Sequence, residues 1–309
     1  MTARYSIGKA AAFADRLGDR AAWYSGGAWE RGRIAVRRTL AQSGLPVTRE
    51  FLSLGCARGN EASGFFSEFC AVVGALAHYE AHTAIYAGLQ VDFADEGLYY
   101  EAAAGPNWWE YYFEPVMIGG ATEATRRTVP LWQHDTWAEN VERQMTRNAA
   151  ASIVRRHIRL KPAVNDQVNE FWRAHAGDGS VIGVHYRGTD KSEEARRVSY
   201  DALAAAVRHT LRGGLAAAKV FLATDEQACV DHMSQAFPDR LITRPVRRSL
   251  DGRPVHKRPG DGFRKGEEAV TDCLLLSRGA ALVRTASNLG LAAGFFNPAI
   301  PVMLVEAGA

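Results

Sequence analysis

Apolar positions in the first half of the chain fall into short strand-like runs separated by a helical pattern. Residues 50–54 form a short strand-like run, a loop of small residues follows, and apolar residues then recur at helical spacing from Phe65 to about His82. Residues 84–93 predict a second strand. A strand, a helix and a second strand in this order make a βαβ crossover, which indicates a parallel sheet. We expect the Ala-, Arg- and Gly-rich first 45 residues to form a helical lead-in.

The second half of the chain continues the alternation of strands and helices. Residues 180–184 have the pattern of a buried strand, and Ser199, a residue type favoured at helix N-caps, precedes a helical pattern that runs to Arg212. Further strands are expected at residues 219–223 and 280–283, and further helices at residues 231–237 and 267–278. This alternation predicts a Rossmann-like α/β unit.

A basic helical pattern over residues 137–174 joins the two halves, and its arginines are typical of a solvated helix face. We place the domain boundary at its end, with an N-terminal α/β domain at residues 1–175 and a Rossmann-like domain at residues 176–309. A chain of 309 residues exceeds the usual size of one hydrophobic core. Two domains would provide a cleft between them.

Composition excludes several classes of protein. With 47% hydrophobic and 23% charged residues the chain resembles an ordinary soluble enzyme, and a net charge of +3 does not by itself indicate a nucleic-acid partner. We expect a cytoplasmic protein without a membrane span, because no run reaches the roughly 18 apolar residues of a membrane helix and no signal-peptide pattern is present. The four cysteines lie far apart without a CxxC pair, which favours buried thiols over a zinc ribbon or disulfide framework: Cys56, Cys70, Cys229 and Cys273.

Polar residues follow the predicted buried strand at residues 180–184, at the edge of a parallel sheet where ligands bind. His185 and Arg187 alternate with Tyr186 and therefore share one side of the strand end. Both can reach one phosphate, and the planar Arg187 guanidinium suits a diphosphate oxygen. The competing interpretation is an ion pair between Arg187 and Asp190 in a loop.

Standard motifs for phosphate and metal binding are missing from the sequence. No GxxxxGK[ST] or GxGxxG run is present, and the nearest approach to a D-x-D metal triplet, Asp92 and Asp95, has the wrong spacing. His78 and His82 stand four residues apart, but no third ligand is obvious and Glu80 is misplaced for a metalloprotease motif. We therefore expect no metal, and a diphosphate neutralised by cationic side chains and helix N-termini.

Four segments resemble, in order, the fucosyltransferase family that includes the core α1,6-enzyme of animals and the rhizobial nodulation enzyme. Residues 185–191, HYRGTDK, resemble the HxRRTDK signature, and residues 221–226, FLATDE, are similar to LATDD. Residues 272–288 and 109–116 resemble two further family segments. The first two motifs are the more specific ones.

The resemblance implies a GT-B fold of two Rossmann-like domains facing a cleft, GDP-fucose as the donor, inversion at the anomeric carbon and no metal or other cofactor. It implies that Arg187 holds the β-phosphate beside His185, and that Asp225 or Glu226 accepts hydrogen bonds from guanine. The remaining residues that it assigns to the donor site are Asp190, Thr285, Ser287 and Asn288.

Three positions depart from the family pattern. The second arginine of the signature is Gly188, and the second aspartate of LATDD is Glu226. The general-base glutamate of the family falls on Ala195, so Glu194 or Glu193, steered by Lys191, is the expected base. Both glutamates could instead be solvated charges that balance neighbouring arginines.

The acceptor is expected on the first domain, near Asn60 and the aromatic stretch with Trp108 and Trp109, because aromatic rings stack on sugars. Core packing is the competing interpretation of that stretch.

Together these features predict an inverting, metal-independent glycosyltransferase that moves fucose from GDP-fucose to a hydroxyl of a glycan or glycoconjugate. The alternatives are the same fold with another nucleotide sugar, or a silent module that binds nucleotide sugars or glycans.

Overall fold

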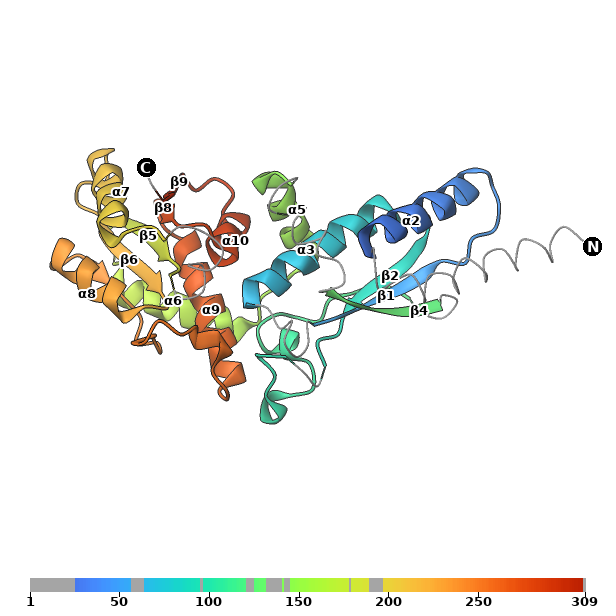
Figure 1. Ribbon diagram of the computed structural model, residues 1–309, viewed down its shortest axis with the longest axis horizontal. Coiled ribbons are helices and arrows are strands. Elements are labelled where there is room, and N and C mark those ends of the chain that lie inside the picture. Colours follow the sequence, from blue (N-terminus) through green and yellow to red (C-terminus); the bar gives the residue numbers. More distant parts are fainter. Residues whose placement is uncertain are drawn as a thin grey trace, which may run out of the picture.

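The computed structural model describes residues 26–56, 64–94, 97–120, 125–131, 141, 145–177, 179–188 and 197–307. Two α/β regions lie side by side along the long axis of the molecule (Figure 1). Each contains one sheet, and the two sheets share no strand. Five candidate site residues lie outside the described residues: Asn60, Asp190, Lys191, Glu193 and Glu194.

The first sheet has the strand order β3-β2-β1-β4. Its strands are β1 (Glu50–Gly55), β2 (Tyr86–Val91), β3 (Met117–Gly119) and β4 (Thr125–Pro130). Strand β1 pairs in parallel with β2 and β4, and β3 is antiparallel to β2. The expected βαβ crossover is confirmed, because helix α3 (Phe65–Ala81) connects β1 to β2.

Helix α2 (Gly26–Gln42) docks on the start of β1 through a carboxylate. Glu50 is buried, and its Oε1 receives Arg33 Nη1 at 2.6 Å and Arg37 Nη1 at 2.9 Å. Burying a carboxylate is unfavourable unless cations compensate it, so these two arginines fix where the helix lies. The described part of the expected lead-in is therefore helical.

The second sheet has five parallel strands in the order β7-β6-β5-β8-β9. They are β5 (Val181–Tyr186), β6 (Lys219–Thr224), β7 (Leu241–Ile242), β8 (Ala281–Arg284) and β9 (Val302–Leu304). The chain runs outward from β5 in one direction and then resumes on its other side at β8. This reversal is the topological switch point at which open α/β sheets bind ligands.

Helices α7 (Tyr200–Arg212), α8 (Gln227–Ala236), α9 (Gly262–Ser277) and α10 (Asn288–Phe296) complete the second region. Ser199 caps α7 as expected, because its hydroxyl accepts a hydrogen bond from the Ala202 amide at 3.1 Å. Helices α8 and α9 begin four and five residues before the positions expected from the apolar pattern. Within the described ranges, short 3₁₀ helices lie at Ala102–Ala104, Trp108–Tyr111 and Val255–Lys257.

The basic helical pattern expected over residues 137–174 is helical but interrupted in its described part. It includes the helices α5 (Arg147–His157) and α6 (Pro162–His175). Pro162 begins α6, and the residue before a proline is disfavoured in helical conformation, so Lys161 adopts an extended backbone. Helix α5 packs against both α3 and α10 and so joins the two regions.

An apolar core runs from the first sheet into the second region. It contains the rings of Phe69, Trp109 and Phe113 together with Leu274 of α9 and Phe295 of α10. The boundary between residues 175 and 176 stays a prediction, because this core contains residues from both sides of it. A second core fills the space between the five-stranded sheet and helices α7 and α8.

All four cysteine side chains are buried, as the sequence predicts. Within the described ranges, no helix combines the length and apolar character that a bilayer crossing requires.

Candidate active site

A cavity of about 400 Å³ opens at the carboxyl ends of β5 and β6. The amino ends of α3 and α10 and one side of α9 complete its wall. Five residues assigned to the donor site from sequence line it together: His185, Arg187, Asp225, Ser287 and Asn288. The second sheet therefore brings residues separated by about a hundred positions to one switch point.

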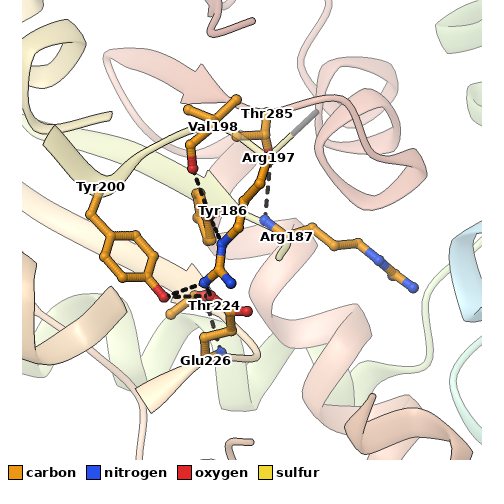
Figure 2. Close-up of polar contacts among 8 residues, drawn as sticks. All are labelled: Tyr186, Arg187, Arg197, Val198, Tyr200, Thr224, Glu226 and Thr285. Atoms are coloured by element: carbon orange, nitrogen blue, oxygen red, sulfur yellow. Dashed lines mark hydrogen bonds and ion pairs between the residues drawn. The ribbon is translucent and has the colours of Figure 1, made fainter. Parts of the chain in front are cut away.

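Arg187 directly follows β5 and is fixed through its backbone. Its amide donates to the Thr285 hydroxyl at 3.1 Å, which ties the end of β5 to the end of β8. Its side chain extends away from the neighbouring tyrosines (Figure 2). The guanidinium comes close to the start of α3, where a methyl group on Gly64 would stand 3.8 Å from Nη1. Arg187 thus spans from the second region toward the first.

His185 lies in the cavity wall as a neutral imidazole. Burial, with smaller contributions from Arg187 and Arg284, lowers the pKa of His185 to about 3. Its Nδ1 is buried and makes no hydrogen bond within the described part of the chain. His185 therefore brings one hydrogen-bond donor to a ligand but no positive charge at neutral pH.

The amino end of α10 supplies a further positive potential. The Ser287 hydroxyl caps the helix by accepting from the Gly290 amide at 3.3 Å, and Asn288 opens the first turn. Gly290 permits a close approach of helix to strand, because a Cβ there would stand 2.9 Å from Arg284 Cδ and 3.3 Å from His185 Nδ1. Helix amino ends attract anions through their unpaired amides and dipole.

The two carboxylates after β6 lie on opposite sides of the chain. Asp225 lines the cavity, and its backbone carbonyl oxygen accepts a hydrogen bond from the Ser249 backbone amide at 2.7 Å. Glu226 is buried outside the lining, where its Oε2 receives Arg197 Nη2 and the Tyr200 hydroxyl, each at 2.7 Å. Of the two guanine-binding candidates, only Asp225 faces the cavity.

Taken together, the cavity has the elements that a nucleoside diphosphate requires. Arg187 and the amino end of α10 suit a diphosphate, and Asp225 suits a base that carries amide and amine hydrogens.

No family model matches the chain. Nodulation protein Z of Bradyrhizobium diazoefficiens is 27% identical over 143 residues, which cover 42% of this chain and 37% of that protein. The matched region thus spans little more than a third of that relative.

Solved structures resemble the chain over most of its length. The fucosyltransferase NodZ from Bradyrhizobium matches with a TM-score of 0.57 at 18% identity, over 84% of this chain and 96% of that one. NodZ α-1,6-fucosyltransferase soaked with GDP-fucose gives 0.53 at 19% identity, over 81% and 94%. POFUT1 in complex with GDP-fucose gives 0.51 at 10% identity, over 84% and 98%.

The chain has the GT-B fold of these fucosyltransferases. The fold expected from the four sequence segments is thereby confirmed, with two α/β regions and a cavity at the switch point of the second sheet.

Two residues assigned to the donor site from sequence lie beside the cavity and are not among its lining residues. Thr285 is buried and holds the Arg187 amide, so it acts on the backbone beside the cavity instead of lining it. Glu226 is the N-cap residue of α8, and its carboxylate accepts hydrogen bonds from Arg197 and Tyr200.

The acceptor role expected for Trp108 and Trp109 is not supported. Each side chain is only 1% exposed. Trp109 packs on Phe113 and Phe69, with ring centroids 4.4 and 6.0 Å apart. A sugar cannot stack on a ring that the core already covers, so core packing is the interpretation that the structure supports.

Several cavity residues were missed by the sequence interpretation. Three cations and two carboxylates of the segment after β7 line the wall: Arg247, Lys257, Lys265, Glu268 and Asp272. Asp272 pairs with Arg244 at 2.9 Å. Burial raises the pKa of Asp272, although the pairing with Arg244 opposes this shift. The crowding of cations over residues 244–264 was visible in the sequence, but no pattern indicated which of them face a ligand.

Tyr99 is a further missed residue, and it anchors the start of α3. Its hydroxyl accepts the Phe65 amide at 2.7 Å, next to Gly64 and the guanidinium of Arg187.

The histidines of α3 belong to a polar helix end. His78 and His82 stack with ring centroids 4.4 Å apart, and His78 Nε2 lies 3.2 Å from the Tyr86 hydroxyl. The described residues contain no group of three His, Cys, Asp or Glu side chains placed to hold a metal ion.

Proposed function

We propose that the chain transfers fucose from GDP-fucose to a hydroxyl of a glycan or glycoconjugate, with inversion at the anomeric carbon and without a metal ion. The observation that carries the proposal is that Arg187, His185, Asp225 and the amino end of α10 all line the same cavity. The structural neighbours with bound GDP-fucose support the choice of donor.

In this proposal the diphosphate lies between Arg187 and the first turn of α10. Arg187 holds the β-phosphate with two parallel hydrogen bonds, which a lysine cannot reproduce. Neutral His185 donates a hydrogen bond to the same group. As the bond to the sugar breaks, negative charge grows on the leaving diphosphate, and these preorganised donors stabilise it.

Asp225 accepts hydrogen bonds from the N1 and N2 hydrogens of guanine. A carboxylate is an acceptor with two oxygens, which matches the two adjacent donors of that base edge. Uracil presents one N–H between two carbonyl groups, and so offers a poorer match to the same carboxylate.

The acceptor hydroxyl must lose a proton while the sugar carbon gains positive character. Glu194 is the proposed base, with Glu193 as the alternative and Lys191 steering the carboxylate. Asp190 belongs to the same segment on the donor side. The acceptor itself is placed on the first region near Asn60. All five residues lie outside the described ranges. The support for Asp190, Lys191, Glu193 and Glu194 is their position shortly after Arg187 in the sequence, and Asn60 is proposed only from its position in the loop after β1.

Metal independence rests on the cationic groups of the cavity, which supply the charge that a divalent ion would otherwise provide. Activity is expected to survive saturating EDTA. Loss of activity on chelation, with recovery on adding Mn²⁺ or Mg²⁺, contradicts this part of the proposal. The proposal also includes a cytoplasmic location, which cell fractionation tests.

Hydrolysis of the donor in the absence of acceptor tests the proposed function, because water can take the place of the unidentified hydroxyl. GDP-fucose, GDP-mannose, UDP-galactose and UDP-glucose are compared, and the anomer first released is followed by NMR. Release of fucose with inverted configuration from GDP-fucose alone supports the proposal. Faster hydrolysis of another donor would show that the chain uses a different nucleotide sugar. Binding without any hydrolysis would indicate a catalytically silent module.

A further inference from the structure

Glu226 stands in a closed cluster of hydrogen bonds beside the cavity (Figure 2). Its carboxylate is buried and accepts from Arg197 Nη2 and from the Tyr200 hydroxyl, each at 2.7 Å. Its backbone amide donates to the Thr224 hydroxyl at 3.2 Å. A carboxylate satisfied in this way has its charge balanced by protein groups and is not aimed at a ligand.

Arg197 connects this carboxylate to the last residue of β5. Its Nε donates to the Tyr186 hydroxyl at 3.1 Å, and that hydroxyl donates in turn to the Val198 carbonyl at 2.8 Å. The hydrogen bond with Tyr186 is the largest of the influences that raise the pKa of Arg197, so its charge is secure. Tyr186 directly precedes Arg187, so the cluster holds the last residue of β5, next to the arginine that extends into the cavity.

Gly188, immediately after Arg187, touches the same carboxylate. A Cβ built on Gly188 would stand 2.5 Å from Oε1 and 2.6 Å from Oε2 of Glu226, well inside van der Waals contact. Any side chain at position 188 would therefore displace Glu226. Because position 188 has no side chain, the carboxylate packs directly against the backbone.

Two of the departures from the fucosyltransferase sequence pattern thus meet in space. The pattern has an arginine where this chain has Gly188, and an aspartate where it has Glu226. The longer Glu226 occupies the space that a side chain at position 188 would need. Arg197, from a different position in the chain, supplies the cation that pairs with the carboxylate.

Arg187 is held from both sides by this arrangement. Its amide is bound to Thr285 on the β8 side, at 3.1 Å. Tyr186 and Gly188 are held on the β6 side by Arg197 and Glu226. The Arg187 side chain leaves this region in the direction opposite to the cluster (Figure 2).

We propose that Glu226, together with Arg197 and Gly188, is a positioning unit that fixes the backbone of Arg187 and takes no part in recognising the base. The inference rests on the proposed function, because it assumes that Arg187 binds the diphosphate of the donor. It assigns specificity for the base to Asp225 alone among the two carboxylates that follow β6.

The first test measures the affinities of GDP and IDP and the rate of GDP-fucose hydrolysis in wild type, Glu226→Gln, Arg187→Ala and the double variant. IDP lacks the N2 amine of guanine, so the ratio of the two affinities reports contacts to the base edge. Glu226→Gln is expected to lower kcat about 10-fold and to leave the GDP-to-IDP ratio unchanged. In the Arg187→Ala background the same substitution is expected to change kcat less than about 2-fold, because Glu226 acts through Arg187.

Glu170→Gln, an exposed glutamate of α6, is the matched control and is expected to behave as wild type. A changed GDP-to-IDP ratio in Glu226→Gln overturns the inference, because it places Glu226 on the base. Equal losses with and without Arg187 also overturn it, because a merely structural contribution is additive. If wild type binds neither GDP nor IDP, the proposed function fails instead.

The second test examines the contact itself, and its melting-temperature arm needs no ligand. Gly188→Ala is expected to lower both the melting temperature and kcat, because its methyl group overlaps the Glu226 carboxylate. Adding Glu226→Asp, one methylene shorter, is expected to restore part of both. Gly188→Ala without effect, or a double variant in which the two losses add, contradicts the coupling of these positions.

Discussion

The carboxyl ends of the two sheets use polar residues differently. In the first sheet, Gln90 Nε2 donates to the Ser53 hydroxyl at 2.9 Å and to Asp92 at 3.3 Å, so the polar groups satisfy one another. In the second sheet, His185 and Arg187 face a cavity together with Asp225. Among the described residues, these polar groups of the first sheet therefore pair with one another, whereas those of the second sheet line a cavity.

The aromatic residues show the same division. The first region buries its large rings in a continuous core, whereas the cavity wall of the second region is rich in charge. A polar residue at a strand end indicates a binding site when it lines a cavity together with other polar residues. A run of aromatic residues without a period indicates a core when the surrounding elements can cover it.

The largest expected effect concerns the aromatic core of the first region. Trp109→Ala is expected to lower the free energy of unfolding by about 3–5 kcal/mol, because it empties a fully buried site. Urea unfolding measures this loss. Trp109→Phe keeps a ring in place and is expected to lose less stability and to hydrolyse the donor at the wild-type rate. A stable Trp109→Ala protein with lost transfer would return this residue to the acceptor site.

The next largest effect is expected for Arg187. Arg187→Ala is expected to reduce turnover of GDP-fucose about 100- to 1000-fold while stability changes little, because a preorganised donor to the leaving group is lost. Arg187→Lys is expected to recover little of the rate, since bidentate geometry is lost. Arg212→Ala, at the exposed end of α7, is the control. Near wild-type turnover in Arg187→Ala would show that the donor does not bind in this cavity.

A smaller effect is expected for Asp225, the carboxylate proposed to bind guanine. Asp225→Asn is expected to weaken GDP binding by about 10- to 100-fold, the usual worth of hydrogen bonds to a charged group. Calorimetric titration measures the change, and Asp166→Asn on the exposed face of α6 is the matched control. Unchanged GDP affinity in Asp225→Asn means that the base lies elsewhere.

The smallest effect is a dependence of stability on pH. The folded protein keeps His185 neutral with a pKa of about 3, whereas the unfolded chain protonates it near the ordinary value of 6.5. The unfolded state therefore binds more protons below pH 6.5, and this contribution to stability is complete above that pH and declines as pH falls toward 3. The expected slope is about 1.4 kcal/mol per pH unit.

Urea unfolding between pH 7.5 and 5 compares wild type with His185→Asn over the window in which few carboxylates titrate. The difference in unfolding free energy between the two proteins is expected to shrink as pH falls. Parallel pH profiles would show that folding does not lower the pKa of His185.

Sequence patterns predicted strands β1, β2, β5, β6 and β8 and the cavity residues that directly follow them, but not β3, β4, β7 or β9. Arg187 follows a buried run, and the carboxyl end of a parallel strand is a ligand position in any open α/β sheet. The break before Pro162 was not predicted, although its cause is local, because a proline disfavours helical conformation in the preceding residue.

Other features depend on tertiary packing and leave no local signal. Lys265 and Tyr99 reach the cavity because two regions of the chain pack together there. Asp225 and Glu226 are adjacent, and which of them faces the cavity is decided by the start of α8 and by Arg197, about thirty residues earlier. Trp108 and Trp109 are covered by Phe93 and Phe113, and periodicity does not reveal such contacts.

The central claim is that the charged cavity of the second region is a GDP site organised by Arg187. Calorimetric titration of wild type and Arg187→Ala with GDP and with UDP tests it most directly. The account predicts that wild type binds GDP at least about 10-fold more tightly than UDP, since Asp225 meets two donors on guanine. It also predicts that Arg187→Ala weakens the binding of GDP. UDP binding as tight as GDP binding in wild type, or unchanged GDP affinity in Arg187→Ala, would contradict it.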